Sequence, residues 1–575
     1  MAADAHPGAS LRRAHYDNGE QALLAVVILV VGLLSVVPVG RLLAEAVAPG
    51  GAFDLSLLKR TLSSAATWRA TWHSVVTATW GTVISLCLGT IFALFVALTD
   101  IRGKAVLVFC FLLPLMIPPQ VTALSWAQLM GPSSPLLNAL GIAPPLGSPH
   151  PLYSAKGIIL LLGIQHAPLV FLTLRAGLRS LPREMVEAAR ACGARRLRVM
   201  TTIVLPLMTP PLVAGGALAF VSAIGNFGIP ALIGIPAGYT VLPTLIYQRL
   251  ASFGPDIISQ VAILSVLIGA VAFLGFVLQN AMLRRRDYRT VGPPSLPLLY
   301  RLGRWRLACE AGCWLLIVLI LVAPLTALLA TSLVSAYGVP LSAATMTFDN
   351  YVEVLFRQEV TIRAFHNSFT LALSASLVLI VIAVPLAYFI VWRRSWLLAV
   401  LNLAAELPYA LPGIVLAIAA ILIFIAPLPL VGVSLYNTIW IILFAYLARF
   451  LTLALRPVVS AVHQTDRSLE EAARMTGARF FFRLRTILFP LLAPAAAAGG
   501  ILVFMTSFNE LTVSALLWSA GNETLGVIVF NLDDGGYTVL ASAVAAVTVV
   551  VIVALMIATA AFTRYLPAGV LPWSE

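Results

Sequence analysis

Long apolar runs with at most one charged residue alternate with short polar segments along the whole chain. A helix needs about 20 mainly apolar residues to cross a bilayer. Runs of this kind cover residues 22–40, 70–99, 105–130, 157–174, 199 to about 226, 257–283, 311–335, 364–392, 395–425, 433–455, 486–509 and 535–563. The segments that separate them are rich in Gly and Pro, as in 131–135, or in Arg. The pattern predicts an all-α membrane protein with twelve transmembrane helices, the first of which is expected to be retained rather than cleaved.

Composition supports this interpretation and excludes a soluble enzyme. Hydrophobic residues make up 60% of the chain and charged residues 10%, against about 25% charged in an ordinary soluble domain. The net charge of +13 comes from 33 Arg and three Lys scattered between the apolar runs. Such an excess in a membrane protein reports topology rather than nucleic-acid binding. Placing both termini in the cytoplasm puts 27 of the 36 basic residues on that side, so we expect both termini to be cytoplasmic and no nucleic-acid partner.

The second half of the chain repeats the first. Ser74, Pro114 and Pro118 recur 294 positions later as Ser368, Pro408 and Pro412. Four further residues recur 284 positions later: Glu187, Gly193, Pro206 and Phe220 match Glu471, Gly477, Pro490 and Phe504. Because six spans is an even number, both copies point the same way through the membrane. We therefore expect two parallel six-helix repeats, at 1–286 and 308–575, joined by a cytoplasmic linker rich in Pro and Arg at 287–307.

One polar motif occurs once in each half, between the fourth and fifth spans. It reads Glu-Ala-Ala, three residues, Gly, and then Ile-x-x-Pro with its Ile ten positions after the Gly. Each copy resembles a short capped helix: Pro182 suits a first helical turn, Ser468 and Glu471 have capping-box spacing, and Gly193 and Gly477 stand where a left-handed C-terminal cap is expected. The paired alanines leave a flat surface that another protein can approach closely.

The doubled motif resembles the signature loop of the permease subunits of ATP-binding-cassette importers, and through the repeat the resemblance covers nearly the whole chain. It implies a type I importer permease fold in the bacterial inner (plasma) membrane. It also implies two copies of a cytoplasmic ATPase and a periplasmic or extracellular substrate-binding protein as partners. In that family the loop forms a coupling helix that docks on the ATPase. The residues that carry this role over are Glu187, Ala188, Ala189, Gly193, Pro206, Glu471, Ala472, Ala473, Gly477 and Pro490.

Fused two-half permeases of this kind resemble iron(III) importers in particular, with thiamine and aminoethylphosphonate permeases as close relatives. The segment 222–234, Ser-Ala-Ile-Gly-Asn-Phe-Gly-Ile-Pro-Ala-Leu-Ile-Gly, is the local feature most like an iron permease. The resemblance thus implies import of iron(III), with thiamine, aminoethylphosphonate or a polyamine as alternatives.

ATP hydrolysis is expected on a partner subunit. A phosphate-binding loop needs Gly-x-x-x-x-Gly-Lys-Ser/Thr, and none of Lys59, Lys104 and Lys156 has that context. We also expect no cofactor and no metal bound by this chain, because clusters of oxygen or nitrogen ligands are missing from the spans.

Six polar residues in or beside the spans are candidates for the translocation path, because ionisable groups inside a membrane are costly. These residues are His166, Asn226, Glu406, Arg449, Asn509 and Glu510. Glu406 and Arg449 could instead form an internal pair between spans nine and ten, and His166 could be an interhelical hydrogen-bonding group. Asn226, Asn509 and Glu510 could simply end helices at the water interface, or form an external mouth where Glu510 attracts a cation.

Two other classes of function remain open at this point. A secondary transporter can also have twelve spans in parallel halves, but the doubled cytoplasmic motif and the lack of an intramembrane acid relay speak against it. A lipid-facing scaffold or enzyme would need a nucleophile and base together, and no such constellation is apparent.

Overall fold

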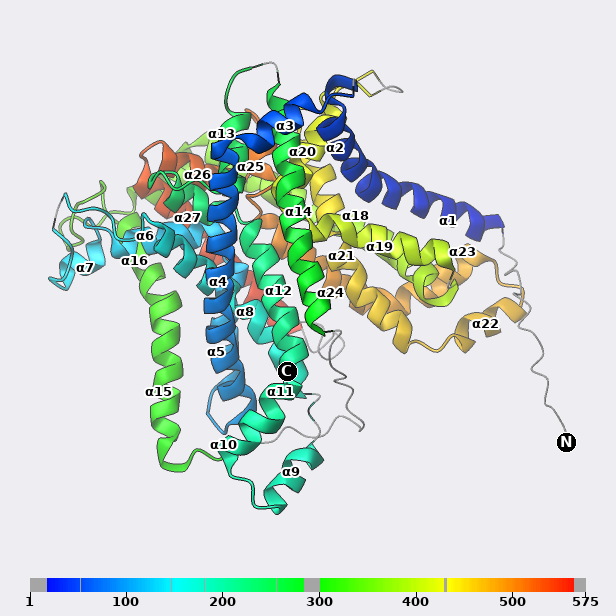
Figure 1. Ribbon diagram of the computed structural model, residues 1–575, viewed down its shortest axis with the longest axis horizontal. Coiled ribbons are helices and arrows are strands. Elements are labelled where there is room, and N and C mark those ends of the chain that lie inside the picture. Colours follow the sequence, from blue (N-terminus) through cyan, green and yellow to red (C-terminus); the bar gives the residue numbers. More distant parts are fainter. Residues whose placement is uncertain are drawn as a thin grey trace.

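The computed structural model describes residues 18–51, 53–145, 147–179, 181, 183–254, 256–283, 300–393, 395–428 and 432–562. Long helices dominate both halves of the described chain (Figure 1). The first half contains α1 (Asn18–Val31), α2 (Val37–Val47), α3 (Ser56–Ser63), α4 (Ala65–Leu98), α5 (Lys104–Met116), α6 (Pro119–Met130), α7 (Pro135–Ala139), α8 (Ala155–Arg179), α9 (Arg183–Ala191), α10 (Arg196–Val199), α11 (Leu205–Leu207), α12 (Thr209–Ile224), α13 (Leu242–Leu250) and α14 (Ile257–Leu283).

The second half repeats this order of long and short helices. It contains α15 (Arg306–Ile317), α16 (Ala323–Ser332), α17 (Asp349–Val352), α18 (Glu359–Tyr388), α19 (Trp396–Ala410), α20 (Gly413–Phe424), α21 (Ile439–Gln464), α22 (Ser468–Met475), α23 (Phe480–Arg483), α24 (Phe489–Phe508), α25 (Ser514–Leu517), α26 (Leu525–Asp534) and α27 (Thr538–Phe562). Most of the predicted linker, residues 287–299, lies outside the described residues.

Nine helices in the described residues are long and apolar enough to cross a membrane, and three bent pairs bring the number to the predicted twelve. The third span of each half is such a pair: α5 and α6 meet at 103°, and α19 and α20 at 107°. The expectation of one continuous helix over 105–130 and over 395–425 was therefore wrong. Pro118 and Pro412 cause the break, because a proline disfavours helical backbone in the residue before it. Ile117 and Leu411 accordingly have extended ψ angles of 133° and 145°.

Four prolines inside spans are each preceded by a widened helical turn, and the span around Pro206 also bends, by 59° between α11 and α12. π-helical turns at Gly32–Val36, Met200–Val204, Val318–Val322 and Leu484–Leu488 each end two residues before Pro38, Pro206, Pro324 or Pro490. A proline has no N–H and clashes with the carbonyl four residues earlier, and that carbonyl lies inside the π turn in every case. The turns before Pro206 and Pro490 are 284 positions apart, so the sequence repeat is also a repeat of helix geometry.

Conserved spacing between the halves also appears in their hydrogen bonds. The Ser74 hydroxyl accepts the backbone N–H of Leu242 at 2.7 Å, and the Ser368 hydroxyl accepts that of Leu525 at 2.9 Å. Each bond satisfies the first N–H of a short helix, α13 or α26, which would otherwise lack a partner. The recurrence of this serine thus reflects the same helix anchor in both halves.

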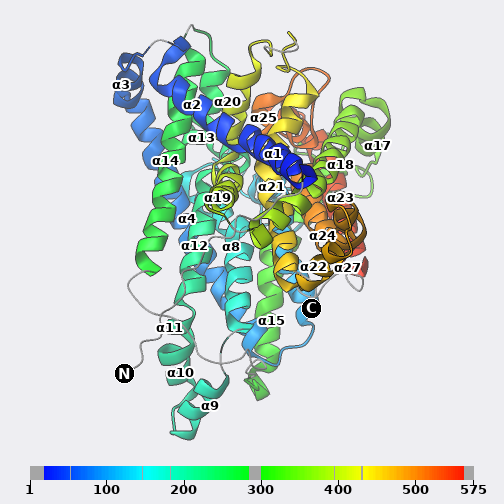
Figure 2. The same cartoon turned by 90° about the vertical axis from the view of Figure 1, so that its right-hand side faces the viewer.

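The first span of each half packs on the other half. α1, α2 and the π turn between them contact α18, α19, α20 and α21 (Figures 1 and 2). In the other direction, α15 and α16 contact α5 and α6 (Figure 1). An ion pair fastens one of these exchanged spans: Nη2 of Arg393 lies 2.7 Å from Oε2 of Glu20, and both side chains are buried. On the other side, Glu310 of α15 accepts the backbone N–H of Arg102 at 2.8 Å.

Candidate functional site

The two motif helices, α9 and α22, lie at the outside of the bundle: α9 projects at the bottom of Figure 1, far from α3 and α13, and α22 lies at its right-hand edge; α9 is again at the bottom in Figure 2. Each follows the fourth span of its half and is followed by the π turn that opens the fifth. The helices are only nine and eight residues long. They are therefore held in place by their ends and by one buried side chain rather than by extensive packing.

The expected glycine caps are present in both copies. Gly193 has φ of 82° and Gly477 has φ of 81°. In each, the next residue donates its N–H to the carbonyl five positions back, from Ala194 to Ala189 at 3.0 Å and from Ala478 to Ala473 at 3.2 Å. This is the Schellman arrangement, in which a left-handed residue ends the helix and turns the chain away from its axis.

The start of α22 differs from the expected capping box. The N-cap residue is Arg467, whose side chain makes no cap hydrogen bond, and the carboxylate of Asp466, one residue earlier, accepts the backbone N–H of Ser468 at 2.9 Å. Hydrogen bonds from Ser468 lower the pKa of Asp466. Ser468 is already the first helical residue. The capping box expected from Ser468 and Glu471 was therefore wrong, because Ser468 lies inside the helix rather than at its N-cap. Pro182, the expected first-turn residue of the other copy, lies outside the described residues.

The two helices present equivalent surfaces. Glu187, Ala188 and Gly193 are exposed and Ala189 is half-buried, and the residues 284 positions later have the same four levels of exposure. The carboxylate of Glu471 lies 3.0 Å from Nε of Arg467 on its own helix. Two surfaces with one pattern of exposure are suited to two copies of the same partner.

A buried contact, not anticipated from the sequence, fastens each motif helix to the base of the fifth span. In the second half Nε of Arg483 lies 3.1 Å from Oε1 of Glu470, and both side chains are 5% exposed. The positions 284 earlier are Val186 of α9 and Val199 of α10; both are fully buried, and α9 contacts α10. We call these two residue pairs the ionic clip and the apolar clip. The signal available in the sequence was that Glu470 and Arg483 of the second half both correspond to valines 284 positions earlier.

Polar candidates in the spans occupy several separate places. Glu406 does not pair with Arg449; its Oε1 lies 2.9 Å from Nη2 of Arg456. The bond still joins α19 to α21, so these spans are tied as expected, but by a different arginine. His166 is buried and its Nδ1 bonds the carbonyl of Leu162 at 2.9 Å. That bond lies within α8, so the expected interhelical bond is not the one observed.

Asn226 and Glu510 end equivalent helices, but not at a water interface. Both residues are buried, 7% and 8% exposed. The Asn226 side-chain oxygen accepts the N–H of Ile229 at 3.1 Å, and the Glu510 carboxylate accepts that of Val513 at 2.9 Å. Each side chain thus caps the next turn inside the protein. Asn509 donates to the carbonyl of Met116 at 3.4 Å, which links the end of the fifth span of the second half to the break in the first.

No group of three or more His, Cys, Asp or Glu that could hold a metal occurs in the parts of the chain that the structure covers. The five cysteines are free thiols, and Cys192, beside the Gly193 cap, is exposed.

Comparison with known proteins identifies relatives across both halves. The chain is 28% identical over 369 residues, 63% of its length, to a probable ABC transporter permease of Sinorhizobium fredii. It is 24% identical over 78% of its length to a ferric transport system permease of Actinobacillus pleuropneumoniae, and 29% identical over 37% to a spermidine/putrescine transport system permease of Haemophilus influenzae. The matches span 63% and 64% of the first two relatives, less than two thirds of their length.

The family of inner membrane components of binding-protein-dependent transport systems matches the chain twice, at residues 85–288 and 379–570. Each match contains one motif helix and one clip. The chain therefore belongs to the family of inner membrane components of binding-protein-dependent transport systems, as a fusion of two such units.

Proposed function

We propose that this chain is the membrane-spanning permease of an ATP-driven importer, and that its solute is iron(III). In this proposal α9 and α22 are the coupling helices. Each docks on one copy of a cytoplasmic ATPase, while an external binding protein delivers the solute to the opposite face. The observation that carries the proposal is the pair of equivalent exposed helices, each with a glycine cap and a buried clip. The doubled family match supports it.

The mechanism follows from how the motif helices are fastened. The apolar clip joins α9 to the segment that opens the fifth span, and the ionic clip does the same for α22. A displacement of either helix by its ATPase is thus passed to the fifth span of that half. Because the first spans are exchanged, the two halves must then move against each other around shared contacts. This is the rocking of parallel repeats that alternating access needs.

Iron(III) is favoured as the solute because the ferric relatives align with both halves. Two ferric permeases match 78% and 76% of the chain. The spermidine/putrescine permease matches only 37%, with somewhat higher identity, so a polyamine is the second candidate. In this proposal both termini are cytoplasmic, ATP is bound by the partner alone, and the chain binds neither cofactor nor nucleic acid.

Reconstitution tests the proposal directly. The purified chain in proteoliposomes is assayed for ATP hydrolysis alone, with its ATPase, and with the ATPase plus a binding protein loaded with iron(III) or with spermidine. We expect no hydrolysis alone and the greatest stimulation by the iron-loaded binding protein. Hydrolysis by the chain alone would refute the permease assignment, and stimulation by the spermidine-loaded protein only would refute iron as the solute.

A further inference from the structure

The breaks in the third spans place the starts of α6 and α20 at the seam between the two halves. The carbonyl of Met116, just before the first break, accepts the Asn509 amide from the other half. At the equivalent place, a Cβ on Gly225 would lie 3.0 Å from Cβ of Pro412, at the second break. α20 is buried along almost its whole length, and so is most of α6. The two broken spans therefore supply the innermost backbone of the molecule.

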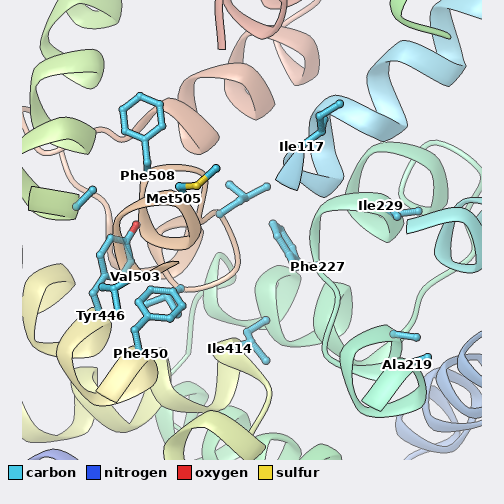
Figure 3. Packing of buried hydrophobic residues seen from close by; sticks show 14 of the residues in the cluster. Ile117, Ala219, Phe227, Ile229, Ile414, Tyr446, Phe450, Val503, Met505 and Phe508 are labelled. Atoms are coloured by element: carbon cyan, nitrogen blue, oxygen red, sulfur yellow. The ribbon is translucent and has the colours of Figure 1, made fainter. Parts of the chain in front are cut away.

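Apolar side chains from both halves face one another across this seam. Ile117 and Phe227 approach from the first half, and Ile414, Met505 and Phe508 from the second (Figure 3). In such surroundings a polar group without a hydrogen bond loses its water and gains nothing in return, a cost of about 1–3 kcal/mol for a neutral group. Any unpartnered polar atom at the seam therefore needs an explanation.

Three side chains at the seam carry such atoms. Gln120 is fully buried, and neither its Nε2 nor its Oε1 has a hydrogen-bond partner in the described residues. Its amide lies between the halves: a Cβ on Gly228 would be 3.2 Å from Oε1, and one on Gly526 would be 3.1 Å from Nε2. Oδ1 of Asn509 and Nη1 of Arg449 are likewise buried without a partner.

Arg449 is the charged residue of these three, and comparison of the two halves shows that its Nη1 does not hydrogen-bond to the backbone at the break. Its counterpart 284 positions earlier, Gln165, donates to the carbonyls of Pro114 and Ile117 at 2.6 and 3.1 Å, the last carbonyls before the first break. Nη1 of Arg449 makes no such bond. Its guanidinium instead lies directly against Gly413, where any Cβ would overlap Nη1.

The nearby carboxylate does not neutralise Arg449 by direct contact. Glu510 replaces Asn226 at the 284 offset, so the second half has a cation and an anion where the first has two amides. The Glu510 carboxylate already accepts the N–H groups of Val513 and Ser514, at 2.9 and 3.2 Å. No ion pair joins it to Arg449 among the residues described. Nη1 of the guanidinium is therefore a buried hydrogen-bond donor that pairs neither with the backbone carbonyls at the break nor with Glu510.

We propose that Arg449, with the amides of Gln120 and Asn509, contacts the solute in the translocation path, and that this solute is an anion with carboxylate or phosphate oxygens. A guanidinium matches the geometry of both groups, and Nε2 of Gln120 adds a further donor. The side-chain oxygens of Gln120 and Asn509 can accept only from a hydroxyl or protonated group of the solute. The inference rests on the proposed function and narrows it, because Arg449 would repel a bare trivalent cation or a polyamine. Iron(III) would then cross as a complex with a carboxylate or phosphate ligand.

The test uses the purified full-length chain without its ATPase. Thermal unfolding is followed while citrate, inorganic phosphate, chloride or spermidine is added at constant ionic strength. We compare the wild type with Arg449→Gln, which installs the residue of the first half, and with Arg456→Gln, a matched loss of charge two turns along α21. Citrate or phosphate should raise the Tm of the wild type and of Arg456→Gln. Their apparent affinity should fall about 10- to 100-fold in Arg449→Gln, and chloride and spermidine should have no such effect.

Equal stabilisation of wild type and Arg449→Gln by citrate and phosphate would overturn the proposal, and so would stabilisation of the wild type by spermidine alone. If Arg449→Gln fails to accumulate, Arg449→Lys replaces it: the charge remains but the planar fork is lost, so anion affinity should be weakened, and an unchanged affinity would again overturn the proposal. Failure of the wild type to associate with any ATPase would refute the proposed function instead, and it would leave the anion result standing.

Discussion

The ionic clip makes a sharp prediction because the first half shows how the same contact works without charge. Glu470→Val and Arg483→Val each leave one buried ion without its partner. Both side chains are 5% exposed, and breaking a buried pair on one side costs about 3–5 kcal/mol. The double substitution removes both charges and recreates the Val186 and Val199 pair of the apolar clip.

The double variant should be less damaged than either single variant. Replacing a buried ion pair by apolar residues is often neutral or stabilising. It also removes the bond from Arg483 to the carbonyl of Ala478, worth about 1 kcal/mol. The double variant should therefore unfold within about 1–2 kcal/mol of the wild type, while each single variant loses several degrees of Tm.

Three measurements check this expectation: thermal unfolding of the purified chain, co-purification of the ATPase, and ATP-dependent uptake in proteoliposomes. Single variants should lose co-purification and uptake together, since a loosened α22 no longer holds its docking position, and the double variant should regain both. Val186→Glu with Val199→Arg is the matched control, which installs the ionic clip in the first half. If the double variant is as impaired as the single ones, or if the single variants behave like wild type, the clip does not hold the helix as described.

Three further predictions concern the two motif helices and the half-buried carboxyl group of Asp533. Gly193→Val and Gly477→Val should each strain the cap by about 1–3 kcal/mol and weaken ATPase co-purification and uptake at normal membrane abundance, and the double Val variant should be inactive. Substitution of the same glycines by Asn, which tolerates positive φ, is the control. Wild-type transport by the double Val variant at normal abundance would contradict the coupling role. Cys192 is exposed beside the first cap, so a maleimide should label it in the free chain and not in the complex with the ATPase. Thr476→Cys provides the same test for the second motif helix. Equal labelling of the free chain and of the complex would show that the ATPase docks elsewhere. Burial raises the pKa of Asp533 from 3.8 to about 6. The folded state therefore holds this proton more tightly than the unfolded state, and the protein loses stability as pH rises from about 4 to 6. Asp533→Asn should flatten that part of the plot of Tm against pH, and an unchanged plot would show that Asp533 does not cause the loss of stability.

Spacing along the chain predicted the number of spans, the repeat and the glycine caps, because each depends on local sequence alone. The breaks at Pro118 and Pro412 were also visible locally, since the residue before a proline avoids helical backbone. The hydrogen-bonding partner of Glu406 could not be predicted from local sequence. Arg449 and Arg456 are seven residues apart, two turns on one face of α21, so only the depth at which α19 packs decides which of them it meets. The burial of Asn226 and Glu510 likewise depends on how the halves meet.

The exchange of first spans has a consequence for how the protein is made. Glu20 enters the membrane with the first span, but Arg393 follows it 373 residues later. At a synthesis rate of about 5–20 residues per second, the second residue emerges roughly 20–75 s after the first. Throughout that interval α1 has neither its ionic partner nor the surface of α18 and α19 on which it finally packs. The first half therefore cannot finish folding while it is being translated, and the final contacts of α1 must wait until Arg393, α18 and α19 have been synthesised.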